Sequence, residues 1–377
     1  MSQQKPIKVR WLIAHFPVQL FLRAAHLFRR ELNKLAPGQF DLEILVGKGD
    51  YLKKYGHELD AETREQLRKF LPVNIKGLEE VKDSVNDLNS TRGVKYSDEE
   101  FAEKLKDGSK DYWDHNVYWK KIFDLLKNQN FEISQTQVNL VGSHLDRNFH
   151  AIDLPYLFEG HDHVAEVLDG EIGRELSRRV QEKTGVQALG YTYSGGYRII
   201  GSTDGITSLN DLNSKKFIGF TAPSSKFFAD ADVNVLARHN TTADDLGDIA
   251  EEGGALETTY IRFHGKNVLK TNHSMFMTSI LTSDKFMNSL TDEQREAFVE
   301  AAHRVSRAER LWSVEDAEQY EVNAVERGIT ITDISADDEA RLRASAANLY
   351  NEETLTSLGI DPDLVNEIRA KGEKYKK

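Results

Sequence analysis

The sequence contains no cysteine. This absence excludes thiol nucleophiles, thiolate zinc sites and disulfide bonds together. It also fits an oxidising compartment, where a free thiol is a liability. Long apolar runs are missing too, because His15, Pro17 and Gln19 interrupt the stretch 11–22. A helix that spans a bilayer needs about 20 apolar residues, so the sequence does not predict a membrane protein.

Basic residues are outnumbered, with 49 Lys and Arg against 61 Asp and Glu, for a formal net charge of −12. A nucleic-acid-binding protein needs a basic face, so we expect no nucleic-acid partner. An excess of one charge keeps a protein dispersed, and we expect a monomer. The first residues lack the apolar core of a signal peptide. If the protein is exported, its signal peptide has been removed ahead of residue 1.

Motifs of catalysis and cofactor binding are also missing. The sequence has no GxSxG elbow, no HExxH, no P-loop and no GxGxxG after a predicted strand. We therefore expect no enzyme and no cofactor. His161 and His163, close to Glu159, suggest a metal site, but the sequence fixes no third or fourth ligand. We predict no metal there and interpret the stretch as the solvated start of a helix.

The elements that are present indicate an α/β protein with more than one lobe, because 377 residues are too many for one ordinary core. Residues 7–13 form an apolar β-rich run, and a helical pattern follows up to residue 32. Pro37 and Gly38 end that helix, and residues 40–46 alternate as a second strand. Strand, helix and strand in this order are typical of a parallel sheet covered by helices.

Further along the chain, the pattern predicts strands at 131–141, 186–193, 199–202, 216–221, 255–261, 275–281 and 329–331. It predicts helices at 119–127, 170–184, 227–238 and 243–252, and two more at the carboxyl terminus. The longest helix should run from Thr291 to residue 326, since Thr291 and Gln294 form a capping box. The charged stretch 47–113 is interpreted as a helical surface insertion, with helical patches at 61–70 and 98–105. A lid or a docking surface is the alternative.

Several motifs, in their order and spacing, resemble the solute-binding proteins of tripartite ATP-independent periplasmic (TRAP) transporters, a dicarboxylate-binding-protein-like family. Residues 153–158 resemble the family's "LPFLF" turn, and residues 195–198 its "NGxR" loop. Residues 209–214 resemble a conserved segment ahead of a strand. Residues 271–273 followed by 290–294 resemble its "tnH…Lp.e.q" signature. The resemblance covers about three hundred residues and is interrupted at the charged insertion.

The resemblance implies a two-lobed, periplasmic-binding-protein-like α/β fold in which one long helix crosses both lobes. Lobe I would comprise residues 1–194 and 276–310, with the insertion at 47–113. Lobe II would comprise residues 195–275 and 311–377. The family implies that a small organic ligand, acidic or polar, binds in the cleft between the lobes. A carboxylate is one candidate, and the partners would be membrane permease subunits of a TRAP transporter, with the protein in the periplasm.

The resemblance also implies ligand-facing positions. An arginine in the strand 216–221 usually holds a carboxylate through two parallel bonds, but that position falls here on Ile218, or on Gly219 if the register slips. The second familiar arginine is Arg198. The other positions that match ligand-facing ones are Ala14, His15, Gln137, Ala243 and Tyr260. Replacement cations are Lys215, Lys226 and Arg262. His273 is expected to be a structural hydrogen-bonding residue near the hinge.

This polar pocket with one cation suggests either a ligand with one weak anionic group or an anion neutralised in another way. Two other functions stay open. A sensory module of the same fold would pass ligand-induced closure to a receptor through the insertion. A hydrolase or lyase on a two-lobed fold would convert its ligand chemically, although the sequence shows no nucleophile with a matching general base.

Overall fold

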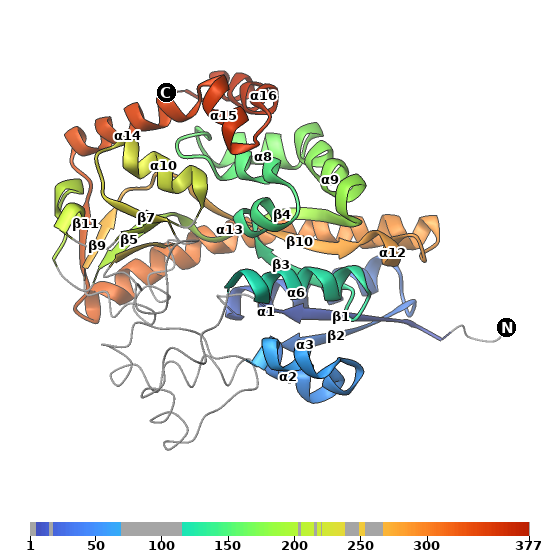
Figure 1. Cartoon of the computed structure of the whole chain (residues 1–377). Helices are drawn as coiled ribbons and strands as arrows, with labels where there is room; N and C mark the ends of the chain where they lie inside the picture. The colour runs from blue at the N-terminus through green and yellow to red at the C-terminus, as the bar shows by residue number, and fades with distance from the viewer. Residues whose placement is uncertain are drawn as a thin grey trace, which may run out of the picture.

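The computed structural model describes residues 5–14, 18–68, 115–202, 205–214, 217–219, 221–237, 249–252 and 267–376. These residues form two sheets with helices around them (Figure 1). The first sheet has the strand order β2-β1-β3-β10-β4, and the second has the order β11-β9-β5-β8-β6-β7. None of the described helices combines the length and apolar character that a membrane crossing needs.

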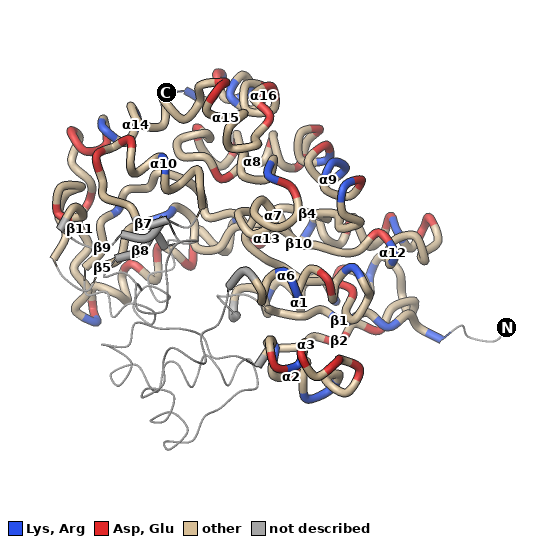
Figure 2. Tube along the Cα trace, in the orientation of Figure 1, with Lys and Arg blue, Asp and Glu red and all other residues tan. Residues whose placement is uncertain are grey.

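The first sheet contains the predicted strand, helix and strand unit. β1 (Ile7–Ile13) runs parallel to β2 (Phe40–Val46), and α1 (Val18–Leu35) connects them. β1 also pairs in parallel with β3 (Ile133–Gln137). β10 (Met275–Ser283) lies antiparallel between β3 and β4 (Val186–Tyr197). Neither β4 nor β10 carries a charged residue, whereas the outer helices carry many (Figure 2).

The second sheet is mixed. β5 (Ile199–Ser202) lies antiparallel between β8 (Ile249–Glu252) and β9 (Asn267–Lys270). β6 (Phe217–Gly219) is parallel to both β7 (Val235–Ala237) and β8. β11 (Thr330–Asp333) joins the edge beside β9 in parallel. The strands predicted at 7–13, 40–46 and 199–202 are confirmed as β1, β2 and β5.

The long helix α13 (Asp292–Glu326) crosses both sheets, as predicted (Figure 1). Its amino-terminal part packs on α1 and β4 of the first sheet, and its carboxyl end reaches β11 of the second. The side chain of Thr291 accepts a hydrogen bond from the Gln294 amide, and the Gln294 side chain accepts one from the Thr291 amide. The helix therefore begins with the predicted capping box, and Gly328 (φ +83°) follows its end.

The remaining helical elements surround the two sheets. They are α2 (Gly47–Tyr55), η1 (Gly56–Glu58), α3 (Ala61–Arg68), α6 (His115–Lys127), α7 (Val138–His144), η3 (Arg147–Asp153), α8 (His161–Leu168), α9 (Glu171–Thr184), η4 (Leu209–Ser214), α10 (Ala222–Asp230), α12 (Asp284–Met287), α14 (Ala336–Leu349), α15 (Glu352–Leu358), α16 (Pro362–Gly372) and η7 (Glu373–Tyr375). The helix predicted at 61–70 is present as α3. The patch predicted at 98–105 lies outside the described residues.

Two strand predictions have the wrong length. The strand predicted at 131–141 ends at Gln137, and α7 follows at once. Residues Val138–Gly142 of α7 are all buried and mostly apolar, so their pattern fits a buried strand or a buried helix equally. In the other direction, β4 continues past the predicted end at residue 193. Gly195 (φ +86°) and Gly196 (φ +75°) adopt backbone angles that only glycine takes readily, and the pairing with β10 shifts register there.

Helix predictions fail in the second sheet and at the carboxyl terminus. The helix predicted at 227–238 is α10, which starts at Ala222 and ends at Asp230, and residues 235–237 form β7 instead. Asp232 breaks the helix with a φ of +60°. Residues 249–252 of the helix predicted at 243–252 form β8. The strand predicted at 255–261 lies outside the described residues. Three α-helices, not two, follow β11.

The carboxyl-terminal helices bear on the predicted division into lobes. α14 packs on α10 beside the second sheet, whereas α16 packs on α8, which lies within the stretch 1–194. Arg179 of α9 also pairs with Asp361 at 2.7 Å. The chain after α13 therefore touches elements from both sides of the predicted boundary, and the boundaries themselves stay a prediction.

Candidate functional site

Arg198 is the single residue between β4 of the first sheet and β5 of the second. A second crossing, residues 271–274, connects β9 to β10 beside it. The backbone N–H of Arg198 donates to the Ser274 carbonyl at 2.7 Å, and the Thr271 hydroxyl donates to the Arg198 carbonyl at 3.5 Å. Arg198 therefore lies where the chain passes from one sheet to the other.

The guanidinium of Arg198 is paired inside the protein. Its Nη2 lies 3.0 Å from Oδ1 of Asp153, and the two side chains are 2% and 8% exposed. The guanidinium also lies 4.4 Å from the ring centre of Phe276, which adds a cation–π contact. Asp153 ends η3 and is the first residue of the turn that resembles "LPFLF". The positive charge predicted for ligand contact is thus balanced by a buried carboxylate.

Two predicted ligand positions lie together on the first sheet. Ala14 directly follows β1, and Gln137 is the last residue of β3. Because β1 and β3 are parallel neighbours, their carboxyl ends meet at one edge of the sheet, which is where open α/β sheets bind ligands. The Ala14 carbonyl accepts a hydrogen bond from the Tyr118 hydroxyl at 3.2 Å, so α6 borders this edge.

The positions predicted on the second sheet are described only in part. Ile218 pairs with Leu236 and with Ala250, and Gly219 is the carboxyl end of β6. His15, Ala243 and Tyr260 lie outside the described residues, as do Lys215 and Arg262. Lys226, the remaining candidate cation, pairs with Asp230 one turn along α10 at 2.8 Å. Nothing in the described part brings Lys226 to the crossing at Arg198.

The stretch around His161 and His163 departs from its predicted role. α8 begins at His161, as expected, but His163 is fully buried and not solvated. Its Nε2 contacts the Ile368 carbonyl at 2.9 Å, and its Nδ1 accepts from the Glu159 amide at 3.2 Å. Burial lowers the pKa of His163, which favours the neutral ring. Within the described ranges, no three potential ligands of a metal ion come together.

His273 matches its predicted structural role. The ring is buried, its Nδ1 lies 2.8 Å from the Thr271 hydroxyl, and it stacks on Phe227 with the ring centres 5.5 Å apart. Its carbonyl accepts from the Tyr156 amide at 2.6 Å. The residue thereby holds the second crossing between α10 and the loop that follows η3.

Sequence patterns did not reveal a buried polar cluster under the first sheet. Gln135 Nε2 donates to Glu309 at 2.7 Å, to Thr192 at 2.8 Å and to Thr278 at 3.2 Å. Glu309 comes from the middle of α13 and is fully buried, and this burial raises the pKa of its carboxyl group well above the usual value. The sequence also predicted no role for Asp153, although this residue is the first of the motif at 153–158. A carboxylate beside an apolar turn was the available signal.

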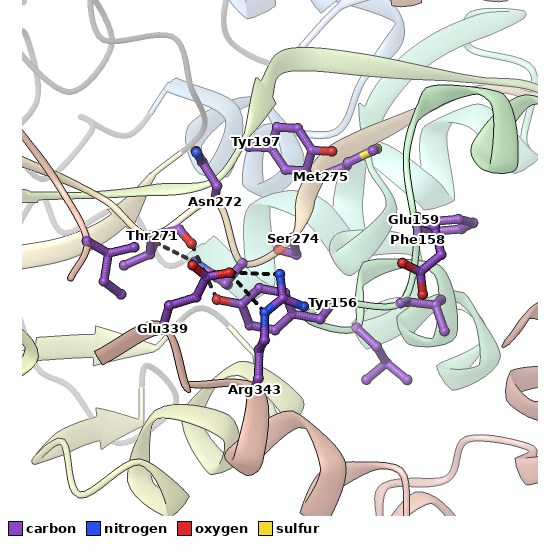
Figure 3. Close-up of a pocket in the computed structure, with 14 residues that line it drawn as sticks. Tyr156, Phe158, Glu159, Tyr197, Thr271, Asn272, Ser274, Met275, Glu339 and Arg343 are labelled. Atoms are coloured by element: carbon purple, nitrogen blue, oxygen red, sulfur yellow. Dashed lines mark hydrogen bonds and ion pairs between the residues drawn. The ribbon is translucent and has the colours of Figure 1, made fainter. Parts of the chain in front are cut away.

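A cavity of about 320 Å³ lies beside the second crossing (Figure 3). Its lining residues come from the loop after η3, from residues 271–275 and from α14, together with Tyr197 and Ile334. None of the five predicted ligand positions that the structure describes, Ala14, Gln137, Arg198, Ile218 and Gly219, lines this cavity. It is therefore separate from the edge formed by Ala14 and Gln137.

Comparison with known proteins identifies a family whose model matches this chain. The model of a family described as bacterial extracellular solute-binding protein, family 7 (DctP), matches residues 118–229 and 263–355. A solute-binding protein of Sulfitobacter sp. (strain NAS-14.1) is 29% identical over 157 residues, which are 40% of this chain. The match spans about half of that relative, 47% of its length.

Solved structures match over almost the whole chain. The sugar acid binding protein DctPAm of Advenella mimigardefordensis, in complex with galactonate, has a TM-score of 0.69 at 16% identity, covering 98% of this chain and 99% of that one. A TRAP periplasmic solute-binding protein of Xanthobacter autotrophicus with bound β-D-galacturonate has a TM-score of 0.63 at 18% identity, covering 97% and 99%. One from Desulfovibrio desulfuricans, with sn-glycerol-3-phosphate, has a TM-score of 0.65 at 13% identity, covering 98% and 97%. At these identities the likeness shows the fold, and the predicted two-lobed fold is confirmed.

Proposed function

This chain belongs to bacterial extracellular solute-binding protein family 7, and on that premise we propose that it captures a small organic acid between its lobes for a TRAP-type transporter. The observation that carries the proposal is the extent of the family match. It includes β3, both strands that flank Arg198, β10, and all of α13. Among these, the step from β4 to β5, the start of β10 and α13 join the two sheets, and capture between two lobes depends on such connections.

The proposed ligand lies between the carboxyl edges of the two sheets. Gln137, Ala14 and His15 would face it from the first sheet, and Ile218, Gly219, Ala243 and Tyr260 from the second, with Arg198 at the crossing. The carboxyl ends of parallel strands supply such a site because the loops that leave them diverge. The lobe division at 1–194 with 276–310 and at 195–275 with 311–377 is part of this proposal.

We favour a hydroxylated acid with one anionic group over a dicarboxylate. Ile218 stands where the resemblance places a carboxylate-binding arginine, and the charge of Arg198 is balanced by Asp153. A second carboxylate would therefore lose its hydration without a matching cation. Hydroxyl groups, in contrast, pair well with an amide such as Gln137. Three structural relatives are in complexes with galactonate, β-D-galacturonate and D-glucuronate, which have this character.

The test is a calorimetric titration with D-galactonate, D-galacturonate, D-glucuronate and succinate. We expect saturable binding of at least one sugar acid and at least tenfold weaker binding of succinate. Saturable binding also raises the melting temperature by mass action, which gives a second readout. Tighter binding of succinate than of every sugar acid would contradict the proposed ligand class.

Arg198 is tested with two variants. Arg198→Ala should weaken the sugar acid by at least tenfold if the guanidinium contacts it, since charge-assisted bonds are lost. Asp153→Asn is the matched control, because it alters the same ion pair while leaving the guanidinium in place. Circular dichroism must first show that both variants fold. Unchanged affinity in Arg198→Ala would remove Arg198 from the site.

Closure is the proposed mechanism. Only the closed state makes the contacts of both lobes at once, so the ligand shifts the population towards it. Small-angle scattering should show a smaller radius of gyration with the bound sugar acid than without it. The protein is proposed to act in the periplasm as a monomer, to pass the ligand to permease subunits and to release it chemically unchanged. Recovery of unmodified ligand after prolonged incubation checks the last point.

A further inference from the structure

Besides residues 271–275 and Ile334, three parts of the chain line the cavity beside the second crossing (Figure 3). Tyr156, Phe158 and Glu159 come from the loop that follows η3. Tyr197 ends β4, and Arg343 with Glu339 comes from α14. Its volume of about 320 Å³ is at the lower end of the range for small-molecule sites. The cavity thus has room for a small ligand.

This cavity is on the other side of the chain crossing from Arg198. Met275 and Tyr197 line the cavity, whereas their chain neighbours Phe276 and Arg198 do not. The guanidinium of Arg198 packs over the Phe276 ring. A molecule in the cavity would therefore contact the back of the crossing, not the proposed sugar-acid site.

The charges that line the cavity favour a cation. Its lining carries two carboxylates, Glu159 and Glu339, and one guanidinium, Arg343. Glu339 and Arg343 form an ion pair at 2.8 Å, one helical turn apart. Within the described residues Glu159 has no ion-pair partner. An anionic ligand would meet an excess of negative charge here, whereas a cation would find the Glu159 carboxylate available.

Aromatic rings point to an organic cation in particular. Tyr156, Phe158 and Tyr197 all line the cavity. The ring of Tyr156 already takes a cation on one face, because the Arg343 guanidinium lies 4.3 Å from its centre. Ring faces combined with a carboxylate are the groups that recognise ammonium ions whose substituents exclude direct hydrogen bonds. A metal ion would instead need several oxygen ligands, and the described residues hold no such group.

The backbone of the cavity wall is held in an uncommon conformation. Tyr156 (φ +54°) and Asn272 (φ +45°) both line the cavity, and both have left-handed backbone angles. Such angles are unfavourable for residues other than glycine, and they persist where the surroundings impose them. Here the Tyr156 amide donates to the His273 carbonyl at 2.6 Å, which fixes the loop against the second crossing. This bond holds the Tyr156 backbone in place at the cavity wall.

We propose that this cavity, beside the second crossing at residues 271–274, is a second binding site that takes a small organic cation, an amine or a quaternary ammonium ion. The ammonium group lies near the Glu159 carboxylate, and the rings of Phe158 and Tyr197 surround its substituents. The site is distinct from the proposed sugar-acid site and does not depend on it.

Choline is the probe, and its binding to the full chain is measured by calorimetry and by saturation-transfer NMR. We expect saturable binding with a dissociation constant on the order of 1 mM, as for other very small ligands. The matched ligand is 3,3-dimethyl-1-butanol, which has the shape of choline without its charge. It should bind at least tenfold more weakly. Absence of saturable choline binding, or equal binding of the neutral alcohol, would overturn the proposal.

Two variants locate the site. Glu159→Gln removes the charge and keeps the shape, and it should weaken choline at least threefold. Glu353→Gln is the control, because it removes one acidic charge from an exposed position on α15. If the two variants weaken choline binding equally, the binding depends on the general surface charge, and the proposed site is wrong. Competition separates the two proposals: displacement of choline by a bound sugar acid would place choline in the inter-lobe site, and would leave the sugar-acid proposal standing.

Discussion

Gln135 Nε2 donates a hydrogen bond to Glu309 Oε1 at 2.7 Å in the interior between β3 and α13. Among the described residues, Gln135 Oε1 and Glu309 Oε2 have no hydrogen-bond partner. A carboxyl group and an amide joined by one such bond can form a second one if the acid keeps its proton. A neutral Glu309 would then donate to Gln135 Oε1 and satisfy both oxygens.

This arrangement predicts how stability depends on pH. Burial raises the pKa of Glu309, so the folded protein keeps a proton that the unfolded chain releases above a pH of about 4.3. The free energy of unfolding should therefore fall as pH rises from there, by up to about 1.4 kcal/mol per pH unit, until the pKa of the folded state is passed. Glu309→Gln retains both hydrogen bonds and cannot ionise.

The measurement is urea unfolding of the natural protein and of Glu309→Gln between pH 5 and pH 8. The two should differ little at pH 5, and the variant should become the more stable one as pH rises. Parallel pH profiles would show that Glu309 is ionised in the folded protein. Gln135→Leu, which removes the partner, should be less stable than either at both pH values.

The ion pair between Asp153 and Arg198 makes a second prediction. Both side chains are buried, so Asp153→Ala leaves an uncompensated charge and should lower the free energy of unfolding by about 3–5 kcal/mol. Replacing both residues, as Asp153→Leu with Arg198→Met, should lower it much less. A double-mutant cycle by urea unfolding measures the difference. Additive losses would mean that the pair does not act as a unit.

The packing of α13 on β4 makes a third prediction. A Cβ atom at Gly190 would overlap Ser306 Oγ and lie 3.2 Å from Ser306 Cβ. Gly190→Ala should therefore destabilise the protein by about 1–3 kcal/mol. Adding Ser306→Ala removes the overlapping oxygen and should restore part of that loss. Thermal unfolding of the natural protein and of the two variants is the check, and failure of the second change to help would place the strain elsewhere.

The start of α13 makes a fourth prediction. Thr291→Ala removes the side-chain oxygen that accepts from the Gln294 amide, and it should cost about 1 kcal/mol of stability. Thr291→Ser keeps that oxygen and should change stability by only a few tenths of this amount. Chemical denaturation of the two variants side by side compares them directly. A loss equal in both would point to the methyl group, not the cap.

Prediction from sequence succeeded where local signals are sufficient. β1, β2 and β5 match their predicted bounds, because short apolar runs between clear breaks define them. The start of α13 also matches its prediction, because a capping box depends on only four consecutive residues. The boundary between β3 and α7 could not be found in this way. Four of the five β3 residues are polar although all five are buried, and α7 opens with a mostly apolar buried run, so no alternation of polar and apolar residues marks the boundary.

The candidate site, too, was predicted only in part. The family resemblance proposed Arg198 and Gln137 as ligand-facing positions, but it gave no partner for the arginine. Asp153 is 45 residues away in the sequence and reaches Arg198 only because the end of η3 lies beside Arg198 in the fold. The cavity beside the second crossing is lined by a loop, the end of a strand and a helix near the carboxyl terminus, so no local sequence pattern could predict it.

The sequence by itself determined the kind of protein: two α/β units, one long helix with its cap, and the family resemblance that the comparison bears out. Each of these depends on neighbouring residues or on motifs in a fixed order. The tertiary structure alone decided that Asp153 neutralises Arg198, whereas the pair of Glu339 and Arg343 follows from their spacing of one helical turn. It also decided that Glu309 is buried beside an amide. Charge pairing and desolvation depend on distances in space, and for Arg198 and Glu309 distant segments of the chain set those distances.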